Sequence, residues 1–145
     1  LSDAYRAIAL SGAAPPTEIM PRAKAAAGKA LDIDERLAEA HTSLSSILFW
    51  YDWNWAAAED QLKRALELNP NNADARIFYA YLLSNMGRHT QALAEAKRAR
   101  ELDPLSLVFN ALEGQFLLHA GMPDEALDRL QKTFELNANF GLAHS

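Results

Sequence analysis

The sequence contains no cysteine and only six glycines among its 145 residues. Without cysteine the chain cannot form disulfides, bind zinc through thiolates or use a cysteine nucleophile. No apolar run approaches the roughly 18 residues that cross a bilayer, and no basic segment followed by an apolar stretch marks a secretion signal. We therefore expect a cytoplasmic chain with no membrane association, although a cysteine-free protein folds equally well in a periplasm.

Basic residues are also fewer than acidic ones. The chain has 14 Lys and Arg against 19 Asp and Glu, which gives a net charge of −5. An acidic surface repels phosphate backbones, so we expect no nucleic acid to bind this segment. It offers no polybasic patch for anionic lipid either. Half of the residues are apolar, which is enough to build a buried core.

The residue patterns of catalysis are missing as well. No glycine-rich phosphate loop is present, and the four histidines (His41, His89, His119 and His144) lack the i,i+4 spacing of a metal-binding helix. The acidic pairs, such as Asp124 with Glu125, fall where they would favour a helix dipole rather than converge on a substrate. We predict no catalytic residue, no metal and no cofactor.

What the chain does have is an internal repeat. Alanines 23, 58, 92 and 126 stand 35, 34 and 34 residues apart, and the segments that follow them end alike. A fixed period of this length is typical of helical repeat arrays. The four similar segment ends are Ala30-Leu31-Asp32-Ile33-Asp34, Ala65-Leu66-Glu67-Leu68-Asn69-Pro70, Ala99-Arg100-Glu101-Leu102-Asp103-Pro104 and Thr133-Phe134-Glu135-Leu136-Asn137.

Each position of the repeat has a physical meaning. A small residue such as Ala58 lets two helices approach closely. Gly87 and Gly121 fall where a left-handed helix cap favours glycine, and Pro70 and Pro104 fall where a second helix must stop. Apolar residues recur at helical spacing between these positions, and no segment alternates with the period of a strand.

The run of Gly87, Ala92, Ala99 and Pro104, set after Tyr79-Ala80, resembles the tetratricopeptide repeat. The resemblance covers almost the whole chain, as one array over 1–145. It predicts repeats at 1–37 (degenerate), 38–72 (with one extra residue in its turn), 73–106 and 107–140, and the start of another at 141–145. The expected helices are 1–11, 17–33, 38–51, 54–68, 73–86, 89–102, 106–120 and 123–137, with a ninth starting near 140.

The resemblance implies an all-α fold, in which about four antiparallel helical hairpins stack into a right-handed superhelix with a concave face. Neither end of the array carries a polar cap. We therefore expect a fragment of a longer protein, or ends that pack on a partner or self-associate.

The aromatic segment from Phe49 to Glu59 and the later Asp103-Pro104-Leu105-Ser106 look like the repeat regions of large bacterial regulators. Such proteins carry a DNA-binding, serine/threonine kinase or nucleotide cyclase domain elsewhere in the chain. This second resemblance implies only the kind of parent protein.

Arrays of this family bind proteins or peptides on the first helix of each hairpin. In this sequence the matching positions form a mixed apolar and amide lining. The positions at which chaperone-binding repeats carry lysine, arginine or asparagine are Thr42, Ser46, Phe78 and Leu112, none of them basic, so we predict that chaperone C-terminal carboxylates do not bind. The predicted partner-binding residues are Thr42, Ser46, Phe49, Trp50, Ile77, Tyr81, Ser84, Asn85, Ala111, Gln115, Leu118 and His119.

The aromatic cluster around Trp50 has two interpretations. Tryptophans anchor interfaces, but large apolar positions are more often core. We expect Trp55 to be buried between hairpins and Trp53 to cover the edge of the core, and we leave both interpretations open for Trp50.

The leading hypothesis is a non-catalytic scaffold that binds a partner protein or peptide within a bacterial regulator. The alternative is a regulatory or oligomerisation module that docks on an attached DNA-binding or kinase domain. An enzymatic function would need a catalytic constellation assembled across repeats, and the sequence shows none.

Overall fold

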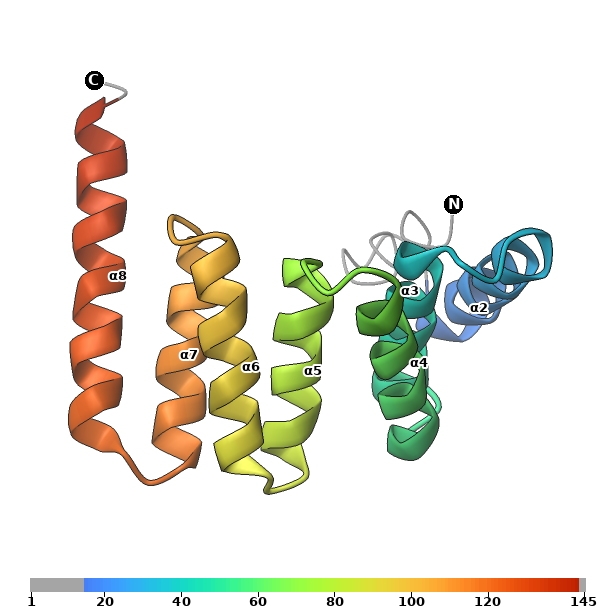
Figure 1. The fold of residues 1–145 in the computed structure, drawn as a ribbon, viewed down its shortest axis with the longest axis horizontal. Helices are drawn as coiled ribbons and strands as arrows, with labels where there is room; N and C mark the ends of the chain where they lie inside the picture. Colours follow the sequence, from blue (N-terminus) through green and yellow to red (C-terminus); the bar gives the residue numbers. More distant parts are fainter. Residues whose placement is uncertain (1–14, 144–145) are drawn as a thin grey trace. The chain divides into compact units, whose positions relative to one another are not determined.

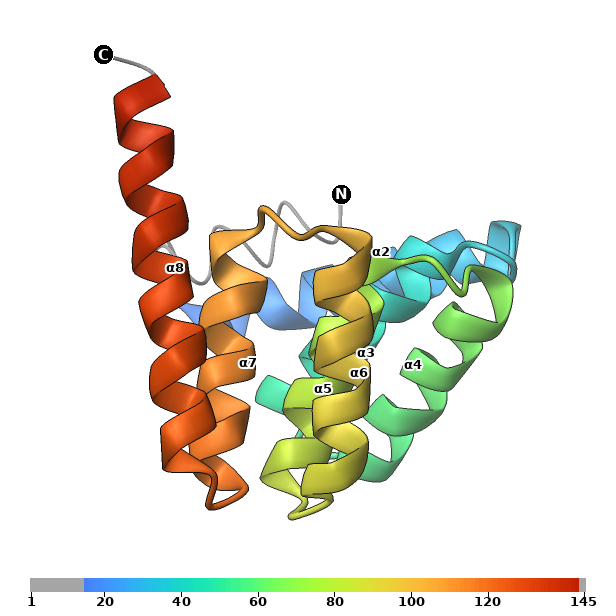
Figure 2. The same cartoon turned by 60° about the vertical axis from the view of Figure 1, so that its left-hand side comes forward.

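The computed structural model describes residues 15–143, and within this range the chain is helical without a strand. Its helices are α2 (Pro16–Ile33), α3 (Ala38–Trp50), α4 (Trp55–Leu68), α5 (Ala73–Asn85), α6 (His89–Leu102), α7 (Leu107–His119) and α8 (Pro123–Ala143) (Figure 1 and Figure 2). The prediction of an all-α fold is confirmed, and the helix expected over residues 1–11 lies outside the described residues. None of the described helices is long and apolar enough to cross a bilayer.

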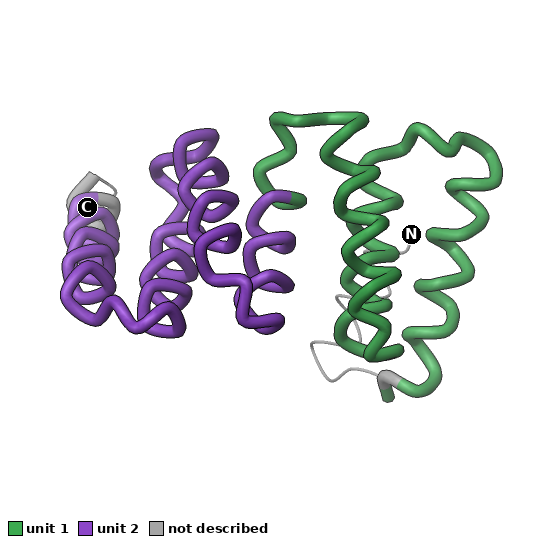
Figure 3. The backbone as a smooth tube through the Cα atoms, turned by 60° about the horizontal axis from the view of Figure 1, so that its bottom comes forward, with its two compact units in different colours: residues 1–75 green, residues 76–145 purple. Residues whose placement is uncertain are grey.

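The chain divides into two compact units, residues 1–75 and residues 76–145 (Figure 3). The described part of the first unit holds α2, α3 and α4. The second unit holds most of α5, then α6, α7 and α8. A single continuous array over residues 1–145 therefore stays a prediction, and each unit is described by itself.

In the first unit α3 and α4 form a helical hairpin, and α2 packs against α3. The contact between α2 and α3 is apolar, because Ile19, Met20 and Ala23 of α2 are buried with Ile47 of α3. The predicted small-residue contact is also present, since Ala58 of α4 is fully buried. Ser45 of α3 donates its hydroxyl to the Ala58 carbonyl at 3.0 Å, which joins the two helices of this hairpin at their close approach.

In the second unit α7 and α8 form a hairpin, and α6 packs against α7 (Figure 2). Ala92 and Ala126, which follow Ala58 in the repeat, are both fully buried. The core also holds Leu82 and Phe116, each almost fully buried. The spacing of the alanines in the sequence therefore predicted fully buried small-residue positions in both units.

The turn from first to second helix uses glycine as predicted. Gly87 and Gly121 have φ of 75° and 76°, in the left-handed region that glycine adopts without a steric penalty. After each glycine, a backbone N–H reaches a carbonyl five residues back, from Arg88 to Leu83 and from Met122 to Leu117, both at 2.9 Å. These bonds satisfy the carbonyls left open at the end of the first helix.

Trp53 occupies the same position in the first unit. It precedes Ala58 by five residues, as Gly87 precedes Ala92, and its φ is 55°. The N–H of Asn54 closes the turn onto the Leu48 carbonyl six residues back at 2.8 Å, so this turn is one residue longer, as predicted. A tryptophan is therefore held in a conformation that normally favours glycine.

The second helices end where the prolines predict. Helix α4 ends at Leu68 and α6 at Leu102, two residues before Pro70 and Pro104. Helix α8 has Ala138 at the corresponding position and continues to Ala143. The predicted break, with a ninth helix starting near residue 140, is therefore wrong, because nothing in this segment lacks an N–H or clashes with the preceding turn.

One polar contact recurs inside each hairpin at the same repeat position. It joins His41 Nδ1 to Gln61 Oε1 at 2.7 Å in the first unit. In the second unit it joins Arg76 to Glu95 at 2.6 Å, and the corresponding residues Asn110 and Arg129 lie 3.5 Å apart. The residue types differ from repeat to repeat, but the same two positions face each other in each hairpin. These positions therefore require a pair of groups that can hydrogen-bond, not particular residue types.

Candidate functional site

Two first helices of the second unit, α5 and α7, bring several predicted binding residues together. Ser84 Oγ of α5 lies 3.0 Å from His119 Nδ1 of α7. The rings of Tyr81 and Phe116 meet edge to face, with centroids 6.0 Å apart. These two contacts place the predicted faces of α5 and α7 side by side, as expected for neighbouring first helices of a repeat array.

The part of this face that solvent reaches is called the α5–α7 surface below. On α7, Leu118 is 52% exposed and His119 is exposed, while Ala111 and Gln115 are partly exposed. On α5, Tyr81 is partly exposed and Asn85 is exposed. The α5–α7 surface consists of Tyr81, Asn85, Ala111, Gln115, Leu118 and His119.

Five other residues of the predicted set are buried. In the first unit the hydroxyl of Thr42 donates to the Ala38 carbonyl at 3.0 Å, and that of Ser46 donates to the Ser43 carbonyl at 2.8 Å. Both hydroxyls therefore bond to their own helix, which leaves little for a ligand. The buried members of the set are Thr42, Ser46, Phe49, Ile77 and Ser84.

The chemistry of the α5–α7 surface is apolar and amide-rich. It contains no carboxylate, lysine or arginine side chain, and its amides are those of Asn85 and Gln115. Asn85 donates its Nδ2 to the Tyr81 carbonyl at 2.8 Å, which fixes the side chain and leaves its oxygen as an acceptor. Among residues 15–143, no three His, Asp or Glu side chains gather as a metal site.

The aromatic turn of the first unit differs from what the sequence predicts. Trp53, expected to cover the core edge, is 75% exposed. Trp55 is only partly buried and stacks on Phe49 with ring centroids 5.7 Å apart, and its indole N–H is buried without a partner. Trp50 is 50% exposed and meets Phe49 edge to face. The prediction for Trp53 was wrong because that residue takes the left-handed turn position, which directs its side chain away from the helices.

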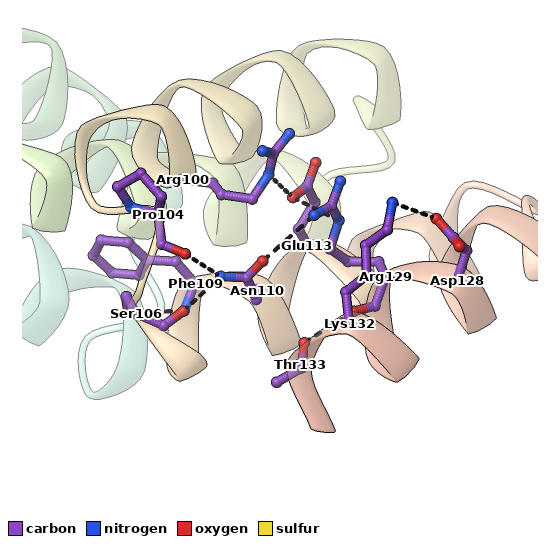
Figure 4. Close-up of polar contacts among 10 residues, drawn as sticks. All are labelled: Arg100, Pro104, Ser106, Phe109, Asn110, Glu113, Asp128, Arg129, Lys132 and Thr133. Carbon is purple, nitrogen blue, oxygen red and sulfur yellow. Dashed lines mark hydrogen bonds and ion pairs between the residues drawn. The ribbon is translucent and has the colours of Figure 1, made fainter. Parts of the chain in front are cut away.

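A charged network in the second unit is the main feature that sequence reasoning missed (Figure 4). Glu113 of α7 is buried, and its Oε2 accepts from Arg100 Nε at 2.6 Å. Arg129 Nε lies 3.3 Å from the same oxygen. The repeat register carried a signal, since the residues matching Glu113 in earlier repeats are Leu44 and Tyr79. A carboxylate in an otherwise apolar column requires cationic partners.

Comparison with known proteins supports the repeat assignment. The model of a family described as "Tetratricopeptide repeat" matches residues 54–116. A curated relative, the small glutamine-rich tetratricopeptide repeat-containing protein 2 of Mycosarcoma maydis, is 31% identical over 84 residues. Those residues are 58% of this chain and 24% of the relative, so the chain spans about a quarter of that protein.

Solved structures show the same tetratricopeptide fold. MamA matches with a TM-score of 0.75 and 23% identity, over 97% of this chain and 88% of that one. A MamA from Desulfovibrio magneticus RS-1 matches with a TM-score of 0.76 and 17% identity, over 95% and 74%. PilF of Pseudomonas aeruginosa matches with a TM-score of 0.77 and 25% identity, over 95% and 62%. The prediction of a tetratricopeptide-type solenoid is confirmed.

Proposed function

We propose that this tetratricopeptide array is a non-catalytic scaffold that binds a partner protein or peptide through the α5–α7 surface. The contact between Ser84 and His119 supports the proposal, because it brings two successive first helices together. Tyr81, Asn85, Leu118 and His119 remain accessible beside that contact.

The chemistry of the surface favours an extended or helical peptide with an apolar anchor. Leu118 and the ring of Tyr81 offer apolar area, which supplies most of the affinity in such interfaces. Asn85 and Gln115 can pair with the backbone amides of a peptide. The absence of a lysine or arginine side chain would leave a terminal carboxylate without a strong cationic partner, so we propose that chaperone tails are not the ligand.

The setting we propose is a bacterial regulatory protein. The aromatic turn and the Asp103-Pro104-Leu105-Ser106 segment resemble the repeats of such regulators. Two of the structural neighbours come from bacteria, Desulfovibrio magneticus and Pseudomonas aeruginosa.

A displayed peptide library provides the test. Peptides selected on the wild-type array would be measured against Leu118→Ser and His119→Ala, which alter exposed side chains, and against Leu127→Ser as control. Leu127 is 68% exposed on α8, outside the proposed surface. We expect about tenfold weaker binding by Leu118→Ser and unchanged binding by Leu127→Ser. Equal affinity of all variants, with helicity intact, would eliminate the α5–α7 surface.

A second candidate function is oligomerisation, or docking on an attached domain. Leu127 and Phe134 of α8 are 68% and 74% exposed. They stand seven residues apart, which places them on one face of the helix, and adjoining exposed apolar residues often mark interfaces. Sedimentation at several concentrations tests this idea. If the chain self-associates and Phe134→Ser abolishes the association, oligomerisation is supported. If the chain is a monomer at all concentrations, oligomerisation is excluded and docking on an attached domain of the same protein is left.

A further inference from the structure

Two adjoining hollows lie against α8. The polar hollow is between α6 and α8, with α7 contributing to its lining, and the apolar hollow is between α8, the start of α7 and the segment just before α7. The polar hollow, of about 280 Å³, is lined by Arg100, Arg129, Lys132 and Glu135 among others. The apolar hollow, of about 450 Å³, is lined by Leu105, Leu107, Leu136 and Asn139. Leu136 and Asn139 line both, so the two hollows adjoin each other at α8. None of these residues belongs to the α5–α7 surface.

The two arginines of the polar hollow are held in place from below. Both turn their Nε toward Glu113 Oε2, Arg100 at 2.6 Å and Arg129 at 3.3 Å (Figure 4). Within residues 15–143, Arg100 makes no other hydrogen bond, so its terminal nitrogens stay available. An arginine anchored through Nε keeps its outer nitrogens as a fixed pair of donors, which suits a carboxylate.

The floor beneath the arginines is also rigid. Asn110 is 2% exposed, and its Nδ2 donates to the carbonyls of Pro104 at 3.1 Å and Ser106 at 2.8 Å. Its Oδ1 lies 3.5 Å from Arg129 Nη1. Because the polar atoms of Asn110 are all hydrogen-bonded, its side chain cannot reorient without breaking these bonds. The hollow is therefore preorganised for a ligand.

The charge of the polar hollow favours an anion. Two guanidinium groups share the single carboxylate of Glu113, which leaves one positive charge uncompensated. Lys132 adds another, and its pairing with Asp128 at 3.0 Å is between groups 53% and 65% exposed. Such a surface pair is worth little, so Lys132 can turn to a ligand. Glu135 lines the same hollow, is exposed like Lys132 and offsets one of these positive charges, so the hollow keeps a smaller net positive charge.

We propose that these hollows bind an acidic peptide segment of a partner protein. A glutamate or aspartate side chain would pair with Arg100, Arg129 and Lys132, and a neighbouring leucine-sized side chain would fill the hollow beside Leu105, Leu107 and Leu136. The apolar hollow is large enough for one such side chain and is partly open to water at Leu105, which is 75% exposed. This site is separate from the α5–α7 surface and would bind its segment independently.

The test titrates the whole chain with the blocked peptide acetyl-Gly-Glu-Leu-Gly-amide. Binding is followed by NMR through the chemical shifts of the arginine Nε–H signals. We expect saturable shifts of Arg100 and Arg129 that weaken as salt is raised. Lys132→Gln should weaken binding about 2–5-fold, and Leu105→Ser about 3–10-fold. Both substitutions change exposed side chains and should leave the fold intact.

Matched controls separate the site from general effects. Lys97→Gln removes an exposed cation from α6 outside the hollows, and Ile33→Ser removes an exposed aliphatic side chain from α2, outside both proposed binding sites; both variants should bind the peptide normally. Equal binding of the peptide with glutamine in place of glutamate would overturn the proposal, as would wild-type affinity in Lys132→Gln and Leu105→Ser. Absence of binding at millimolar peptide concentration would also overturn the proposal. A dimer that Leu105→Ser dissociates would overturn it too, because the hollows would then be occupied by a second copy of this chain.

Discussion

Trp53 allows a sharp test of the backbone geometry. At this position the glycine variant should be more stable than the alanine variant, whereas inside a helix alanine is the more stable of the two. The residue has φ of 55° and stands where Gly87 and Gly121 stand in the next two repeats. Alanine in a left-handed conformation costs about 1–2 kcal/mol. Glycine avoids this cost but loses about 0.4–1 kcal/mol of additional chain entropy on folding.

The expected result follows from these two terms. Trp53→Gly should be more stable than Trp53→Ala by about 0.5–1 kcal/mol. Relative to the wild type, both variants lose the indole contact. Because the side chain is 75% exposed, that contact covers only about 50 Å² and is worth about 1 kcal/mol. Trp53→Gly should therefore be nearly neutral, and Trp53→Ala should be destabilised.

Urea unfolding followed by far-ultraviolet circular dichroism measures the difference without relying on tryptophan fluorescence. The control is Ala94→Gly, at an exposed position inside α6, where glycine should cost about 1 kcal/mol. If Trp53→Ala proves as stable as Trp53→Gly while the control behaves as expected, the left-handed turn at residue 53 is wrong.

Three further predictions concern the second unit. A Cβ added at Gly114 would lie 2.8 Å from Leu130 Cγ, so Gly114→Ala should lower the free energy of unfolding by about 1–3 kcal/mol. In a Leu130→Ala background the same substitution should cost less, because the clashing side chain is gone, and urea titrations of the four variants measure the difference. Glu113→Gln should cost about 2 kcal/mol, because two arginines lose their charged partner; a change under about 0.5 kcal/mol by the same measurement would show that solvent replaces it. Ala138→Pro should end α8 near residue 136, as the prolines end α4 and α6; helical Cα chemical shifts persisting through residue 143 would contradict this.

Much of the fold could be predicted because repeat positions encode local geometry. Gly87 and Pro104 act through backbone restrictions that depend only on their neighbours, so the described helix boundaries agree with the prediction to within one residue, except at the end of α8. That exception has the same cause, since Ala138 carries no restriction and the helix continues. The alanine at residue 138 therefore already indicates in the sequence that α8 continues without a break.

The candidate site was predicted less completely. The resemblance to the tetratricopeptide repeat selected the faces of α5 and α7 that meet through Ser84 and His119. It could not separate buried members of those faces from accessible ones, because burial depends on which helices lie alongside. Ser84 is buried while Leu118 is half exposed, and nothing in the local sequence of either residue indicates this difference.

By itself the sequence determined the helical hairpins, their period and their tight alanine contacts, because these follow from backbone restrictions and side-chain size repeated along the chain. Only the tertiary structure decided which polar groups meet. Arg100, Glu113 and Arg129 come from three helices, and a charge on one helix finds its partner only when packing brings the others within a few ångströms. The same packing formed the hollows beside α8.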